Sequence, residues 1–298
     1  MKAVLYLCTL LLAAALPACC QDCGDIPDEP EVPTRTLAVH VSVDGSLRDY
    51  RDIEAGRSES MLMRFTAVAS RDTEILTSTV SMVPDFTMDV PEGVCALTVF
   101  ADYIPEGSAE DFHFFTDIFE ELLVKNRVNY QPNVPSRVAY YGRKAIVAQT
   151  QRVSVATSVA MAQYRLVASD RPDYEVGNVR ISFNSGYPAA IDGLTGDVCR
   201  SWGGLAFNAF PQAETIAADM VFADSVETVL NAKVEVYDTD GKLRARIQSV
   251  DIPVVRGGVT NVRGPFYTTY EEDERIPDDE GSGIQINPEF ASDIVIKI

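Results

Sequence analysis

The stretch TLAVHVSVDG, residues 36–45, decides the fold class that we expect for this chain. Apolar and polar residues alternate along it, with Leu37, Val39, Val41 and Val43 on one side and Ala38, His40 and Ser42 on the other. Successive side chains of a β-strand point to opposite faces, so this period of two predicts a half-buried strand that ends at a glycine turn.

The same alternation recurs along the chain, in residues 94–103, 152–168, 178–183 and 232–250. In the last of these, Asp240 and Gly241 separate two alternating runs, which predicts a hairpin turn. Helical spacing occurs in EDFHFFTDIFEELLVKN, residues 110–126, through Phe115, Ile118, Phe119, Leu122 and Leu123. We therefore predict a mainly β protein with one short helix.

The domain organisation follows from length and from the strand pattern. A chain of 298 residues exceeds one typical core, which favours two domains. Short strands separated by Gly, Pro and Asp turns favour β-sandwiches over alternating strands and helices. We place the N-terminal sandwich at 35–148 and the C-terminal sandwich at 149–298. No internal sequence repeat is evident.

The first residues predict export and attachment. Lys2 precedes an apolar run, residues 3–16, that is shorter than the roughly 20 residues needed to span a bilayer. This pattern predicts a signal peptide over residues 1–18. The order Leu16-Pro17-Ala18-Cys19 resembles the bacterial lipobox. That resemblance implies cleavage before Cys19 and a lipid anchor on its thiol.

Residues 19–34 are expected to form an acidic tether between the lipid and the globule. They carry five acidic residues and three prolines, with no basic residue before Arg35. Cys20 and Cys23 have C-x-x-C spacing, but a closed zinc site needs a second pair of ligands. The other cysteines and histidines are not spaced as such a pair. We expect no metal, and Cys20 and Cys23 either free or joined to each other.

Composition and motifs argue against several function classes. The net charge of −19 excludes nucleic acid as a partner, because its phosphates require lysine and arginine. No nucleophile elbow, zinc-protease motif or phosphate-binding glycine loop is present. The acidic run EEDERIPDDE, residues 271–280, lacks the ligand spacing of a calcium loop and predicts a solvated loop. We therefore predict no enzyme and no cofactor.

Five further side chains have competing interpretations. Trp202 can stack on a sugar or anchor a core or loop, and we favour the anchor. We expect Cys95 and Cys199 to be buried thiols, with a disulfide between them as the alternative in an oxidising compartment. We expect His40 and His113 to be structural.

Several stretches follow one another in a characteristic order: DVPEGVCALTVFADYI (89–104), SVAMAQYRLVASD (158–170), GYPAAIDGLTGDVCRSWGG (186–204) and VEVYDTDGKLRARIQSVDIPVVRGGVTNVRGPFYT (234–268). In order and spacing they resemble the fimbrillin-type lipoproteins of Bacteroidales, subunits of type V pili that include anchor-like members. The resemblance implies two tandem transthyretin-like β-sandwiches, delivery to the outer membrane, and pilus assembly or adhesion without catalysis. Its implied partners are other pilus subunits.

The resemblance also suggests roles for both ends of the chain. In polymerising members a trypsin-like protease cuts after an arginine beyond the first strand, and Arg48 and Arg51 stand in that position here. The alternative is that both are ordinary loop arginines. Anchor members of the family keep the first strand. At the other end, SDIVIKI (292–298) alternates Ile294, Ile296 and Ile298. It either completes its own sheet or is donated to another subunit.

Two functions remain in competition. The first is a lipid-anchored fimbrial subunit or anchor protein at the cell surface, which acts by β-strand complementation. The second is a surface lipoprotein that binds a glycan or a host protein, with Trp202 and tyrosines as the contacts.

Overall fold

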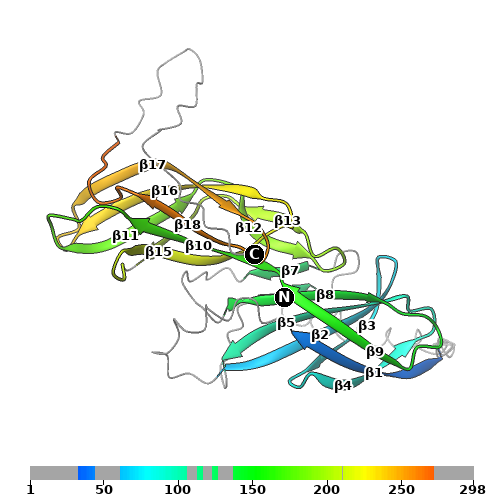
Figure 1. The fold of residues 1–298 in the computed structure, drawn as a ribbon. Coiled ribbons are helices and arrows are strands. Elements are labelled where there is room, and N and C mark those ends of the chain that lie inside the picture. The colour runs from blue at the N-terminus through cyan, green and yellow to red at the C-terminus, as the bar shows by residue number, and fades with distance from the viewer. Residues whose placement is uncertain are drawn as a thin grey trace, which may run out of the picture. The chain divides into compact units, whose positions relative to one another are not determined.

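A computed structural model describes residues 33–43, 61–105, 113–116, 123–126, 137–209 and 211–271 (Figure 1). Within these ranges the chain forms β-strands arranged in four sheets, and none of it is α-helical. The prediction of a mainly β fold is therefore confirmed.

The first sheet has seven strands in the order β3-β2-β5-β8-β9-β1-β4. Their bounds are β1 Thr34–Val43, β2 Met61–Arg71, β3 Glu74–Ser81, β4 Asp85–Pro91, β5 Ala96–Pro105, β8 Ala139–Ala145 and β9 Arg152–Val159. Strands β3 and β4 follow each other directly in the chain but stand at opposite ends of this order. The sheet therefore folds back on itself.

The first core cluster lies within this folded sheet. Side chains of all its strands except β3 supply buried residues to it, among them Leu37, Val39, Phe65, Val90, Leu97, Tyr140 and Val155. Later strands add Met161, Ile191, Met220 and Phe222. The period of two in TLAVHVSVDG thus places its apolar side in this core, as predicted.

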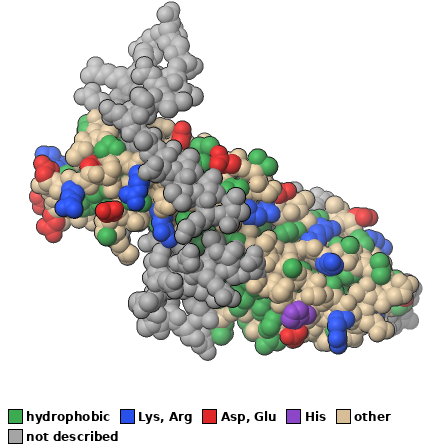
Figure 2. All heavy atoms as spheres, in the orientation of Figure 1, with side chains coloured by type: hydrophobic (Ala, Val, Ile, Leu, Met, Phe, Trp, Pro, Cys, Tyr) green, Lys and Arg blue, Asp and Glu red, His purple; other side chains and the backbone are tan. Residues whose placement is uncertain are grey.

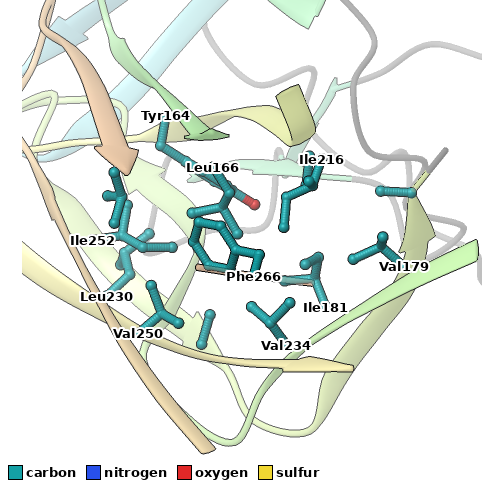
Figure 3. Close-up of a cluster of buried hydrophobic side chains, with 14 of the residues drawn as sticks. Tyr164, Leu166, Val179, Ile181, Ile216, Leu230, Val234, Val250, Ile252 and Phe266 are labelled. Atoms are coloured by element: carbon teal, nitrogen blue, oxygen red, sulfur yellow. The ribbon is translucent and has the colours of Figure 1, made fainter. Parts of the chain in front are cut away.

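A second core cluster is formed by strands of two other sheets. One sheet has the order β15-β10-β18 and the other β14-β11-β16-β17. Their bounds are β10 Met161–Ala168, β11 Val176–Phe183, β14 Leu205–Ala209, β15 Thr215–Phe222, β16 Thr228–Asp238, β17 Leu243–Val254 and β18 Val259–Gly264. Figure 3 shows the fully buried Phe266 ring among Leu166, Ile181 and Val234.

Two details of these strands bear on the sequence expectations. Strands β16 and β17 form the predicted antiparallel hairpin, in which Gly241 has a φ of 77° and Asp238 Oδ1 accepts from the Lys242 N–H at 2.9 Å. The predicted single run 152–168 is divided at Ala160. Its first part, β9, pairs in the seven-stranded sheet, and its second part, β10, packs in the second core.

The fourth sheet corrects the predicted helix. Its order is β13-β12-β7-β6, with bounds β6 His113–Thr116, β7 Leu123–Asn126, β12 Tyr187–Asp192 and β13 Val198–Trp202. Strands β6 and β7 lie inside residues 110–126, and β7 also pairs with β12. The apolar spacing matched a helix, but the aromatic and branched residues of this segment suit strands equally well. The pairing of β7 with β12 favours the strand over the helix.

The described surface mixes charges of both signs. In Figure 2 acidic and basic side chains lie interspersed with hydrophobic ones on the face in view. The net charge of −19 is therefore not expressed there as one uninterrupted acidic field.

Candidate functional site

Strand β1 occupies an interior place in the seven-stranded sheet. It pairs antiparallel with β4, from Thr34 opposite Pro91 to His40 opposite Asp85. On its other side it pairs parallel with β9, from Ala38 opposite Arg152 to Val43 opposite Thr157. The first described strand of the chain is thus bonded along both edges.

The inward side of β1 is deeply buried. Leu37, Val39 and Val41 are 0%, 3% and 3% exposed. Burying an aliphatic side chain of this size contributes about 1.5–3 kcal/mol relative to leaving it in water. These three residues are therefore the main source of the free energy that holds β1 in place.

The polar contacts of β1 lie at the surface and add less. Thr36 Oγ1 donates to Asp89 Oδ1 at 2.8 Å, and His40 Nδ1 lies 2.8 Å from Asp85 Oδ1. The His40 and Asp85 side chains are 48% and 74% exposed, so water weakens their attraction. At the start of the strand, the Arg35 guanidinium donates to the Val147 and Thr150 carbonyl oxygens.

The connectivity of β1 makes it separable from the rest of the sheet. Both of its partners, β4 and β9, come later in the chain, and only residues 44–60 join β1 to β2. A cut in that connection would release β1 and leave every other described strand on one continuous chain. Loss of β1 would leave main-chain groups of β4 and β9 unpaired beside exposed apolar positions. A site of this kind can accept a strand from another chain.

The residues singled out from the sequence as functional lie outside the described ranges. These are Cys19, Arg48, Arg51, Ile294, Ile296 and Ile298. The lipid anchor, the processing sites and the donor strand therefore stay predictions.

A buried charged network, which the sequence analysis missed, lies beside the first core. Arg64 of β2 donates two hydrogen bonds to Asp102 of β5. Its Nε donates to Oδ1 at 2.9 Å, and a terminal nitrogen donates to Oδ2 at 2.7 Å. His113 of β6 places Nδ1 3.3 Å from Asp102 Oδ2. The Asp102 and His113 side chains are both 0% exposed.

A second ion pair extends this network toward the later strands. The Arg137 guanidinium, at the start of the segment leading into β8, pairs with Asp219 of β15 and donates to the Met220 carbonyl oxygen at 3.0 Å. Tyr187 of β12 donates its hydroxyl to Asp219 Oδ2 at 3.1 Å. We name these six residues, Arg64, Asp102, His113, Arg137, Tyr187 and Asp219, the charged hub. They come from three sheets and from the segment before β8.

A sequence signal for the hub did exist. Asp102 in VFADY and Asp219 in IAADMVF are single charges inside apolar runs of predicted or observed strands. A charge in such a place is stable only if it is paired. The pattern could have marked both aspartates as buried, but it could not have named their arginine partners.

The structure corrects the expectation for the two thiols and supports the one for Trp202. Cys95 and Cys199 are exposed rather than buried, and Cys95 is a free thiol, which rules out the Cys95–Cys199 disulfide. Cys95 directly precedes β5, which begins at Ala96. Trp202 packs against the second core and stacks on Tyr187 at an interplanar angle of 7°.

No group of three or more His, Cys, Asp or Glu side chains in the part of the chain that the structure describes is arranged to hold a metal ion. No helix there is long and apolar enough to cross a membrane.

A mainly β protein with two core clusters and a separable first strand is thus the class that the fold defines. The chain belongs to a family of unknown function, DUF6562, whose model matches residues 34–298. A search of curated proteins finds no match to it.

Solved structures show distant similarity. A "putative cell adhesion protein" from Bacteroides eggerthii is 10% identical, with 89% of this chain and 96% of that chain covered and a TM-score of 0.47. A "putative adhesin" from Bacteroides ovatus is 12% identical, with 74% and 83% covered and a TM-score of 0.44. The tip fimbrial protein Mfa3 from Porphyromonas gingivalis is 9% identical, with 78% and 94% covered and a TM-score of 0.36. Similarities at this level do not fix the function of this chain.

Proposed function

We propose that this protein is a non-catalytic cell-surface subunit of a fimbrial or adhesive assembly, which joins its neighbours by β-strand complementation. The observation that carries the proposal is the position of β1 in the seven-stranded sheet. It is an interior strand that is hydrogen-bonded along both edges, and a single cut after it would separate it from the rest of the chain. The two cores then correspond to two tandem sandwiches, of the transthyretin-like type that the sequence resemblance implies.

The acceptor site would be the place that β1 now fills. Its floor consists of the first-core positions beneath Leu37, Val39 and Val41, and its walls are the edges of β4 and β9. A donor strand must therefore carry aliphatic residues at alternate positions. The segment SDIVIKI meets this requirement through Ile294, Ile296 and Ile298. Arg48 and Arg51 lie in the connection where a trypsin-like cut would free β1.

We further propose that Cys19 carries the lipid that attaches the mature protein to the outer membrane. The mature N-terminus distinguishes two kinds of subunit. A chain that begins at an acylated Cys19 keeps β1 and acts as an anchor, whereas one that begins after Arg48 or Arg51 has lost β1 and can polymerise. Intact-mass analysis of protein extracted from its native membrane separates these two masses.

Deletion of residues 292–298 tests the donor role. We expect the truncated chain to keep the urea midpoint of the full chain, because a donor strand acts on another subunit and not on its own sheet. We also expect it to lose association with subunits whose β1 has been removed by limited trypsin digestion. Size-exclusion chromatography of the mixture measures this association, and the full-length chain with the same digested acceptor is the control.

Two results would count against the proposal. A truncated chain that unfolds in isolation would show that residues 292–298 complete their own sheet. A truncated chain that stays folded and still associates as the full-length chain does would show that assembly uses another element.

A further inference from the structure

His113 is the titratable member of the charged hub near neutral pH, and it is enclosed on every described side. Its ring lies 5.6 Å from the Phe100 ring of β5 and 5.4 Å from the Phe222 ring of β15, measured between centroids. Its Nδ1 faces Asp102, and its buried Nε2 has no hydrogen-bond partner among the described residues. The backbone carbonyl of His113 accepts from Arg64 at 3.4 Å.

Charged groups of both signs act on His113. Arg64 and Arg137 are permanently cationic, and Arg64 pairs with Asp102 while Arg137 pairs with Asp219. A proton on His113 would add a third positive charge to a place that water does not reach. Asp102 would attract that charge, whereas both arginines would repel it.

Burial is the largest of these effects and lowers the pKa of His113 below its ordinary value of 6.5. The hydrogen bond and the charge of Asp102 oppose this change, and the charges of Arg137 and Arg64 add to it. A His whose pKa falls on folding binds fewer protons in the native state. Its contribution to stability is therefore complete above pH 6.5 and is lost as the pH falls below 6.5 toward the lowered value.

We propose that the charged hub is an acid-sensitive latch that holds β6 against β5 and β15. Above pH 6.5 the neutral ring of His113 fits between Phe100 and Phe222 and binds Asp102. In acid, states in which β6 has separated take up the proton and become more populated. Strands β16 and β17 carry no member of the charged hub, so we expect the opening to be local.

The size of the effect follows from the pKa of an exposed histidine. At pH 5.5, one unit below 6.5, a proton-binding open state gains about tenfold in population relative to a native state that stays unprotonated. We therefore expect hydrogen exchange in β5, β6 and β15 to become up to about tenfold faster between pH 7.5 and 5.5, after correction for intrinsic rates. Exchange in the β16–β17 hairpin should change much less.

Matched variants separate His113 from other titrating groups. His113→Gln keeps an N–H donor for Asp102 but cannot titrate, so it should lose the local change between pH 7.5 and 5.5. His40→Gln removes the other histidine, which is 48% exposed at its side chain, and should behave as the wild type. The proposal is overturned if His113→Gln keeps the change, or if all strands lose protection equally.

A second measurement does not require a His113 variant. The chain has two histidines, so His40→Gln leaves a single imidazole whose protonation NMR follows directly. We expect that signal to titrate below pH 6.5. A midpoint at or above 6.5 would show that the ring is not held neutral by its surroundings and would exclude the latch.

Discussion

Asp102→Ala is expected to lower the free energy of unfolding by about 3–5 kcal/mol, because it removes a fully buried carboxylate that pairs with Arg64 and lies beside His113. The Asp102 carboxylate binds Arg64 through both oxygens and also faces His113, and its side chain is 0% exposed. Urea denaturation at pH 7.5 measures the loss through the shift in midpoint.

Asp89→Ala is the matched control for this change. Asp89 also accepts a hydrogen bond across two strands, from Thr36, but it lies at the surface. Its replacement should alter the free energy of unfolding by no more than about 0.5 kcal/mol. Equal and small losses in both variants would mean that the charged hub contributes little to stability.

Val39→Asp is expected to cost about 3–5 kcal/mol, since it forfeits the burial of an aliphatic side chain and places a carboxylate in the first core. Val39 is 3% exposed at the centre of β1. The loss should be concentrated on the contacts of β1, so hydrogen exchange should accelerate most in β1, β4 and β9. Thermal unfolding gives the total effect, and hydrogen exchange gives its location.

Ser42→Asp provides the comparison in the same strand. Ser42 is exposed on the opposite side of β1, so a carboxylate there stays in water and should be tolerated. The proposed acceptor site adds a further expectation: Val39→Asp should associate with donor strands without proteolytic removal of β1. A Val39→Asp chain as stable as Ser42→Asp would show that β1 is not held by its buried face.

The sequence correctly predicted the strands and turns that are specified by residues close together in the chain. Alternation located β1 at 36–45 against the observed Thr34–Val43, and an Asp-Gly pair located the β16–β17 turn. The segment 110–126 was mistaken for a helix because its strand partner, β12, is distant in the chain and adds no local signal.

The candidate site was predictable only in part. The buried face of β1 follows from its alternation, but its neighbours β4 and β9 depend on topology that no short segment encodes. The charged hub was missed for the same reason. Arg137 and Asp219 are 82 residues apart, so the apolar run around Asp219 could indicate a buried charge but could not identify its partner.

The parallel pairing of β1 with β9 has a consequence for how the protein is made. Ser42 and Thr157, which meet across these strands, are 115 residues apart in the chain. Contacts of such large sequence separation form slowly. During synthesis β1 emerges before β9, so one edge of β1 cannot be bonded until β9 has followed. Throughout that interval Leu37, Val39 and Val41 face water in a strand already patterned for pairing. A chaperone that shields this segment should therefore raise the yield of folded protein, because β1 is synthesised well before both of its partner strands.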